Sequence, residues 1–365
     1  MRTPASNASV SRIPLAALGA SLLGGCFGLG PNRVAHDRAD YSDAISESWK
    51  RQTLLNVVKL RYLDPPIFVE VGQIVAGYSL ETAVDVRGQL SSSTAIQGDS
   101  ALFGAAGKFT DRPTITYTPL TGNQFVRALM TPLTPASVFF TIQSGWPADG
   151  VLLATLASLN GLRNQETSIS GATPPDPDFL RALQLFRSIQ LSGCVGMRVK
   201  QDVQKQESTI LTLRAQGVGE ETMAEIRELR RLLRLDPEAT EFSLVFGGVP
   251  ADNREVAVIT RSLLHILTTM AAQVEIPAED LEQGRATPGL PAGDEAAERH
   301  RLVRVRSSNR KPSDASVAVP YRGHWFWIDD RDLRSKRAFA FMLMLFTLSD
   351  TGQKEALPLI TISAQ

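Results

Sequence analysis

One stretch, residues 67–119, constrains the fold more than any other part of the chain. Between residues 79 and 90, apolar and polar positions alternate: Leu80, Thr82, Val84, Val86, Gly88 and Leu90 against Ser79, Glu81, Ala83, Asp85, Arg87 and Gln89. A period of two is typical of a strand with two different faces. Residues 101–109 alternate small and apolar residues, and the β-branched run 114–118 indicates a further strand. The sequence therefore predicts a strand region, with a polar turn near residues 91–99.

Helical patterns flank this region. A first helix is expected over residues 40–63, ended by Pro65 and Pro66, because apolar residues recur there at helical spacing. Further helices are predicted over residues 125–130, 134–145, 147–159, 176–192, 220–235, 252–274 and 333–348.

Cap signals mark the start of three of these helices. Residues 121–124 (Thr-Gly-Asn-Gln) and residues 252–255 (Asp-Asn-Arg-Glu) fit the capping-box pattern. Thr134 followed by Pro135 fits an N-cap with proline in the first turn.

The elements occur in clusters rather than in strict alternation. Strands are also expected over residues 195–199, 241–246, 302–306, 317–321, 325–328 and 359–363. Residues 277–299 are rich in Pro, Gly, Ala and Glu and indicate a mobile loop. Clustering favours an α+β fold with an antiparallel or mixed sheet over a doubly wound one, with one main body over residues 37–365.

The first 25 residues have the pattern of an export signal. A basic segment precedes the apolar run 13–23, which is too short to stay in a bilayer as a helix. Leu23-Gly24-Gly25-Cys26 resembles the lipobox of bacterial lipoproteins. We therefore expect cleavage before Cys26 and its acylation, for example with palmitate, because two or three chains anchor a protein stably. Residues 26–36 then form a tether, and Phe27 favours the periplasmic face of the outer membrane over the alternative, the inner membrane.

The rest of the composition bears on disulfides and on charge-driven partners. Cys194 is the only other cysteine, so no intrachain disulfide remains after lipidation, and a buried, inert thiol is expected there. The 38 basic and 38 acidic residues balance. This balance gives no global field toward nucleic acid, which is not an expected partner.

Known catalytic motifs are not matched. Gly104 to Lys108 lacks the spacing of a phosphate loop, and Phe109 follows it. Ser308 and Lys311 have the Ser-x-x-Lys spacing, but its companion motifs are missing. No metal or cofactor is expected, because the four histidines have no paired spacing: His36, His265, His300 and His324.

Residues 321–332 are the densest mixture of aromatic, histidine and carboxylate residues. The candidate ligand-binding residues are His324, Trp325, Trp327, Asp329, Asp330 and Asp332. The mixture suits sugars and small polar ligands. The favoured interpretation is structural: an amphipathic strand with the tryptophans on one face and Phe326 and Ile328 on the other, running into a helix capped by an aspartate.

The strand region 78–118 also has two interpretations. The favoured one is a one-sided antiparallel sheet covered by helices. In the other, each copy of the chain contributes a hairpin to a multi-subunit outer-membrane barrel, because spanning strands need only about 9–11 alternating residues.

Three segments together resemble an uncharacterised family of proteobacterial outer-membrane lipoproteins: residues 56–69, 111–117 and 321–336. The resemblance spans most of the mature chain and implies an exported, lipid-anchored protein with no known activity, so it assigns no functional residues. The expected function is a non-enzymatic binding or scaffold component of the cell envelope. Its expected partners are the membrane, through the lipid anchor, and an envelope protein or peptidoglycan. The alternative is an envelope enzyme acting on peptidoglycan or another glycan through His324, Asp329, Asp330 and Asp332.

Overall fold

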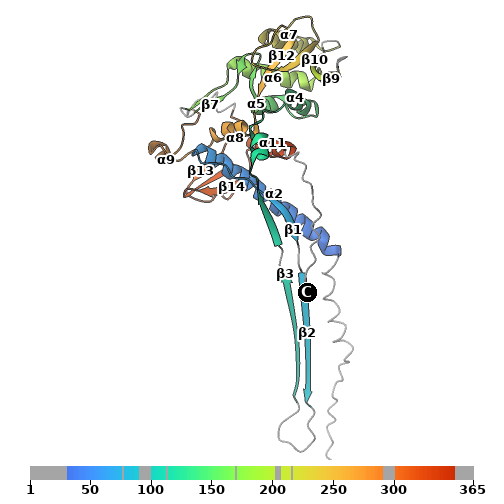
Figure 1. Cartoon of the computed structure of the whole chain (residues 1–365), viewed down its shortest axis with the longest axis vertical. Helices are drawn as coiled ribbons and strands as arrows, with labels where there is room; N and C mark the ends of the chain where they lie inside the picture. The colour runs from blue at the N-terminus through green and yellow to red at the C-terminus, as the bar shows by residue number, and fades with distance from the viewer. Residues whose placement is uncertain are drawn as a thin grey trace, which may run out of the picture. The chain divides into compact units, whose positions relative to one another are not determined.

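A computed structural model of the chain describes residues 31–75, 78–89, 100–111, 114–168, 171–201, 207–214, 217–290 and 301–349 (Figure 1). The chain divides into two compact units, with the boundary after Trp49. The described part of the first unit is helical and belongs to α2 (Pro31–Arg61). The predicted export signal, Cys26 and the strand predicted at residues 359–363 lie outside the described residues.

α2 begins earlier than expected, within the stretch predicted to be a tether. At its end, Leu63 has a positive φ of 60°. The Leu63 N–H donates to the carbonyl of Leu60, and the Asp64 N–H donates to that of Lys59. These bonds form a Schellman motif, which satisfies the last carbonyls of the helix. The helix therefore ends at this cap, ahead of Pro65.

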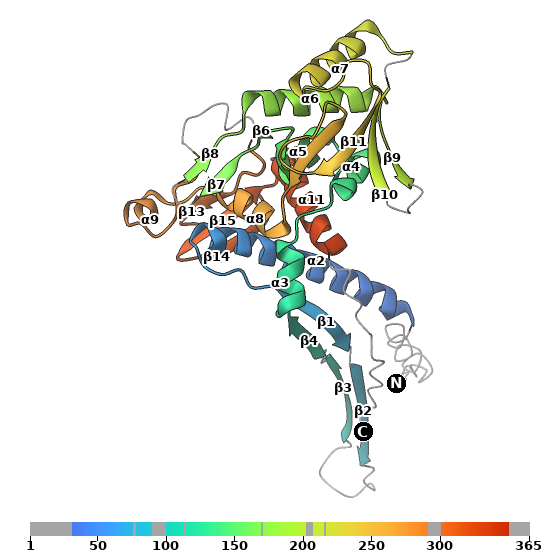
Figure 2. The same ribbon diagram turned by 45° about the horizontal axis from the view of Figure 1, so that its top comes forward.

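The predicted strand region is confirmed. β1 (Val69–Val75) pairs with β4 (Thr114–Pro119), and β2 (Tyr78–Gln89) pairs with β3 (Ser100–Asp111), both antiparallel (Figure 2). Val75 lies opposite Thr114 and Tyr78 lies opposite Asp111, so the same number of residues separates the two pairs on each strand. The β1–β4 register from Gln73 to Val75 therefore matches that of β2–β3, whereas a β-bulge shifts it between Val71 and Gln73. We call these four strands the ribbon.

The ribbon departs from the favoured interpretation of a sheet covered by helices. In the described part of the chain, β1–β4 and β2–β3 are each two-stranded sheets. All six side chains of β4 are exposed, so for this strand the covered-sheet interpretation is wrong. An alternating pattern predicts the two faces of a strand, but the element that covers a face is set by tertiary contacts.

The largest sheet has six strands in the order β6-β5-β12-β11-β10-β9. β11 and β12 are parallel and the other pairs are antiparallel, so the sheet is mixed. α6 and α7 pack against each other, α5 against α6, and α4 against β9 and β11 (Figure 2). The bounds are α4 (Pro135–Gln143), α5 (Ala148–Thr155), β5 (Leu156–Leu159), β6 (Leu162–Arg163), α6 (Pro177–Leu191), β9 (Val195–Gln201), β10 (Glu207–Leu213), α7 (Glu220–Leu232), β11 (Glu241–Phe246) and β12 (Glu255–Thr260).

The long helix predicted over residues 252–274 is wrong. Its first half is β12, and only α8 (Leu263–Ala271) is helical, with Ser262 as its N-cap. The carboxylate of Asp252 accepts the Arg254 N–H in a turn instead of capping a helix. Val256, Ala257 and Val258 are fully buried between β11 and β5. Burial on both faces explains the lack of alternation, which a helix also produces.

Two other helix starts differ from each other. α3 (Asn123–Met130) begins where expected, but Gly122 is its N-cap and no side chain caps it, so the capping box at residues 121–124 is not formed. α4 has the predicted cap, because the Thr134 hydroxyl accepts the Ser137 N–H. The helix predicted over residues 147–159 ends early, at Thr155, and continues as β5.

The loop predicted over residues 277–299 is partly ordered. It contains α9 (Ala278–Glu282), in which Asp280 is buried. The Thr287 N–H donates to the Arg61 carbonyl and the Leu290 N–H to that of Ala272. Residues 291–300 lie outside the described residues.

A buried cation joins α5 to the sheet. Arg261 is 1% exposed and donates to the carbonyls of Leu153 and Ala154, in the last turn of α5, and to that of Gln165. A positive charge at a helix C-terminus is favourable, because the unsatisfied carbonyls gather there. Burial nevertheless lowers the pKa of Arg261 to about 10.

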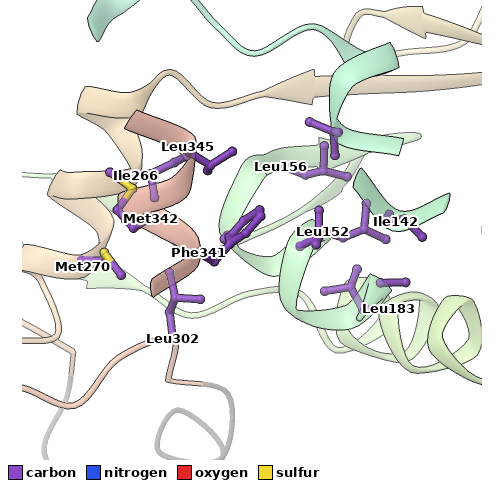
Figure 3. Packing of buried hydrophobic residues seen from close by; sticks show 14 of the residues in the cluster. Ile142, Leu152, Leu156, Leu183, Ile266, Met270, Leu302, Phe341, Met342 and Leu345 are labelled. Atoms are coloured by element: carbon purple, nitrogen blue, oxygen red, sulfur yellow. The ribbon is translucent and has the colours of Figure 1, made fainter. Parts of the chain in front are cut away.

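The described part of the chain ends with a three-stranded sheet in the order β13 (Arg306–Ser308), β15 (His324–Asp329) and β14 (Ala315–Tyr321), followed by α11 (Leu333–Ser349). A small hairpin, β7 (Glu166–Ser168) and β8 (Gly171–Thr173), completes the described strands. The core joins α4, α5, α6, α8 and α11 (Figure 3). Cys194 is buried, as predicted.

The fold is therefore α+β with mixed and antiparallel sheets, as the clustered patterns predicted. Among the described residues, no helix is both long enough and apolar enough to span a membrane.

Candidate functional site

The three-stranded sheet has one buried face and one outer face. Phe326 and Ile328 are fully buried, together with Val317 and Val319 of the neighbouring strand β14. Successive residues of a strand alternate between faces, so Trp325 and Trp327 lie on the opposite side, where both are half-buried. The predicted division of the strand into a buried and an outer face is confirmed.

Two cations lie beside the tryptophans on this outer face. Lys311 Nζ lies 5.5 Å from the centre of the Trp325 ring. Trp327 lies opposite Arg306 in the ladder, and Trp325 lies opposite Pro320, which is exposed. A cation within about 6 Å of an aromatic ring is attracted by the ring quadrupole, as Lys311 is at Trp325. Arg306 is paired with Asp329, which lies on the same face as the tryptophans, so this face is aromatic and carries charges of both signs.

Two of the candidate carboxylates form ion pairs in the corner, the name we give to residues 329–336, where β15 runs into α11. Asp329 contacts Arg306 Nη1 at 3.2 Å and accepts the Arg331 N–H at 2.9 Å. Asp330 contacts Lys336 Nζ at 2.6 Å. Each pair joins the end of β15 to a neighbouring element, so both carboxylates have a structural role.

The third carboxylate caps α11. Asp332 accepts the Ser335 N–H at 3.0 Å and the Ser335 hydroxyl at 2.6 Å. Burial by itself would raise the pKa of Asp332, but the hydrogen bonds from Ser335 and the Arg334 N–H, together with the charge of Arg334, outweigh it and lower the pKa. The predicted capping of this helix by one of the three aspartates is confirmed.

His324 lies at the other end of β15 and faces α9. Its Nε2 is 3.3 Å from a carboxylate oxygen of Glu279. Its Nδ1 is buried and has no hydrogen-bond partner among the described residues. The candidate residues are thus separated along the strand: the tryptophans share a face, the aspartates gather at one end, and His324 lies at the other.

Beside His324 is a polar cluster that the sequence patterns did not indicate. The Tyr62 hydroxyl donates to Asp280 at 2.7 Å, and the Tyr321 hydroxyl donates to Asp64. The guanidinium of Arg322 contacts Asp64 at 2.9 Å and lies 4.9 Å from the centre of the Tyr62 ring. Tyr62 and Asp280 are 218 positions apart, so no local pattern could have paired them.

The protonation states in this cluster are well defined. Burial, followed by the hydrogen bond to Asp280, raises the pKa of Tyr62. The same hydrogen bond lowers the pKa of Asp280, and Arg285, 3.2 Å away, lowers it further. The proton therefore stays on the tyrosine and the negative charge on the carboxylate, which makes this cluster a fixed clamp between α2, α9 and β14.

A cavity of about 260 Å³ lies elsewhere in the body, between α4 and β9. Its lining is mostly apolar and includes Phe139, Ile142, Val195 and Met197. None of the candidate ligand-binding residues lines it. In the part of the chain that the structure describes, no group of three or more His, Cys, Asp or Glu residues is placed to hold a metal ion.

Comparisons of the chain with protein-family models, with curated proteins and with solved structures find no match. The function proposed for the chain therefore rests on its own residues.

Proposed function

We propose that the protein is a lipid-anchored, non-enzymatic binding or scaffold component of the cell envelope. Cys26 holds it on the periplasmic face of the outer membrane, and the outer face of the three-stranded sheet contacts an envelope partner. One observation carries this proposal: the carboxylates of the corner are bound to groups of the fold, while Trp325 and Trp327 remain on the outer face.

The contacts of the aspartates favour this function over glycan hydrolysis. A glycosidase needs two carboxyl groups that face one substrate, one as acid and the other as base or nucleophile. Asp332 is bonded to Ser335, and Asp329 and Asp330 are paired with Arg306 and Lys336. Using any of them in catalysis would break a contact that holds either the end of β15 or the start of α11.

The outer face has the chemistry of a contact surface. Aromatic and arginine residues are enriched where proteins meet, because they bury a large area and present a polar or charged tip. Here two tryptophans lie among Arg306 and Lys311. An envelope protein or peptidoglycan that packs on aromatic rings fits this combination best, because Arg306 is already paired with Asp329.

Two measurements test the proposal. A Cys26→Ser variant should leave the membrane fraction, because its acyl chains are lost; recovery in the membrane at the unchanged level would contradict the anchor. A Trp325→Ala, Trp327→Ala double variant should lose the proteins or peptidoglycan fragments that copurify with the intact lipoprotein after crosslinking in cells.

The matched control for the tryptophans is Phe140→Ala. Phe140 lies on α4 and is 64% exposed, so its change also removes a surface aromatic ring. If the double variant and the control retain the same partners, the contact assigned to the sheet is wrong. If the purified chain cleaves peptidoglycan and Asp329→Asn abolishes the cleavage, the non-enzymatic function is wrong.

A further inference from the structure

We infer that β2 and β3 of the ribbon insert into the lipid bilayer, with their free edges paired to the same strands of further copies of this chain. The register of the ribbon carries this inference. Cross-strand partners lie on one face of a ladder, and neighbours along a strand lie on opposite faces. The pairing from Tyr78↔Asp111 to Gln89↔Ser100 is continuous, so it assigns every residue of both strands to a face.

One face of β2–β3 carries no ionisable residue between its ends. The pairs on it are Leu80↔Phe109, Thr82↔Gly107, Val84↔Ala105, Val86↔Phe103 and Gly88↔Ala101. The other face carries all four charged residues found inside the strands, with Glu81 directly opposite Lys108, and Asp85 and Arg87 further along β2. The sequence pattern alone showed the alternation of β2; the register adds that β3 matches it in phase.

The dimensions of the strands suit a bilayer. β2 and β3 have 12 residues each. A tilted strand crosses the hydrocarbon region with about 9–11 residues. Aromatic residues mark the membrane interface of such strands, and here Tyr78 begins β2 while Tyr117, in β4, is 61% exposed. The apolar face therefore has the length that lipid contact requires, with aromatic residues toward the end nearest β1 and β4.

The free edges of β2 and β3 need further β-strands with which to pair. In the described part of the chain, β2 and β3 pair only with each other, so each strand has one edge that no described strand covers. Hydrocarbon offers no hydrogen bonds, and only a sheet closed on itself satisfies every strand edge there. In a ring of copies, β3 of one chain lies antiparallel to β2 of the next, which closes the sheet with one repeated contact.

A ribbon of this kind is poorly suited to standing alone in water. An isolated two-stranded hairpin is marginally stable in water, and long free edges promote unwanted association. Both difficulties disappear when the ribbon pairs with its copies. The acyl chains proposed on Cys26 would hold those copies on one bilayer surface, but the inference rests on the ribbon and is independent of the tryptophan face.

The first test measures lipid contact at neighbouring positions. Val84→Cys and Asp85→Cys variants of the full, lipidated chain are labelled with an environment-sensitive fluorophore in vesicles of phosphatidylethanolamine and phosphatidylglycerol. Nitroxide-bearing lipids should quench most emission from the label at residue 84 and little from that at residue 85. Phe103→Cys and Gly104→Cys should repeat the contrast in β3. The unsubstituted chain gives the background, because Cys194 is buried.

The second test measures pairing between copies. Adjacent strands lie about 4.8 Å apart, so equivalent residues of neighbouring two-stranded hairpins are about 10 Å apart. A bismaleimide of that span should join Asp85→Cys chains into dimers in vesicles. Equal quenching at residues 84 and 85 would overturn the insertion, and alternating quenching without dimers would overturn the pairing of copies. Neither result changes the copurification test of the tryptophan face, so failure of this inference is distinguishable from failure of the proposed function.

Discussion

β12 and β4 are strands of the same length in opposite environments. Each has six residues and each contains β-branched side chains. In β12, Val256, Ala257 and Val258 are fully buried, whereas every side chain of β4 is exposed. β12 is stabilised by the core on both of its faces, whereas β4 is stabilised by its ladder with β1. Strand propensity is therefore compatible with both extremes, and tertiary contacts decide between them.

The largest expected effect comes from a comparison of two aromatic residues, one buried in the core and one exposed on the ribbon. Phe242 in β11, beside β12, is 1% exposed, and Tyr117 in β4 is 61% exposed. Phe242→Ala should lower the free energy of unfolding by about 3–5 kcal/mol, because it leaves a cavity in the core. Tyr117→Ala should cost less than about 1 kcal/mol. Urea titrations followed by circular dichroism measure both, and similar losses would show that the ribbon is packed as the body is.

The sequence predicted those parts of the fold in which a local pattern and the tertiary contacts agree. The ribbon strands follow the period of two, and the Thr134 cap and the Asp332 cap follow local capping chemistry. β12 was predicted as helix because Asp252 and Glu255 have capping-box spacing and the apolar run after them does not alternate. Pairing with β11 and β5 prevailed over that local signal.

The candidate site also contains features that the sequence could predict and features that it could not. The two faces of β15 could be predicted, because alternation along a strand is local. The clamp of Tyr62 on Asp280 could not, because its partners come together only when α2 and α9 pack against the last sheet. The partners of Asp329 and Asp330, likewise, depend on where β13 and α11 lie.

Removing the clamp should have the second largest effect. Tyr62→Phe deletes the hydroxyl that donates to the buried Asp280 carboxylate, and hydrogen bonds to charged groups contribute about 1.5–3 kcal/mol. The loss at pH 7 should lie in that range. Tyr62→Phe keeps the ring that packs edge-on against Phe326 and Tyr321, so the change isolates the hydroxyl.

The same variant has a defined pH dependence. The Tyr62 hydrogen bond lowers the pKa of Asp280, so its stabilisation is present above about pH 4, the pKa of an unfolded aspartate, and is lost as the pH falls through the lower folded pKa. The difference between wild type and Tyr62→Phe should therefore be constant from pH 7 to about pH 5 and shrink on further acidification. A difference that grows toward low pH would contradict the assigned charge on Asp280.

A local contact within the body should have a smaller effect. Thr134→Ala removes the hydroxyl that accepts the Ser137 N–H at the start of α4, and such caps contribute about 1 kcal/mol. Thr121→Ala is the matched control, because the capping box expected there is not formed and Gly122 takes the N-cap position of α3. Thermal unfolding should separate the two variants, and equal shifts would show that the α4 cap carries no stability of its own.

The smallest expected effect on the body is the most informative about the ribbon. Replacing residues 81–108 by Asn-Gly joins Leu80 to Phe109, which are cross-strand partners, through a turn that suits a two-residue hairpin. The six-stranded sheet has no strand from the ribbon, so the unfolding midpoint of the body should stay within about 1 °C of wild type. The shortened chain should nevertheless lose any assembly that depends on the ribbon. A large fall in the midpoint would mean that the body needs β2 and β3 to fold. The exposed strand β4 would then belong to an element that stabilises the body.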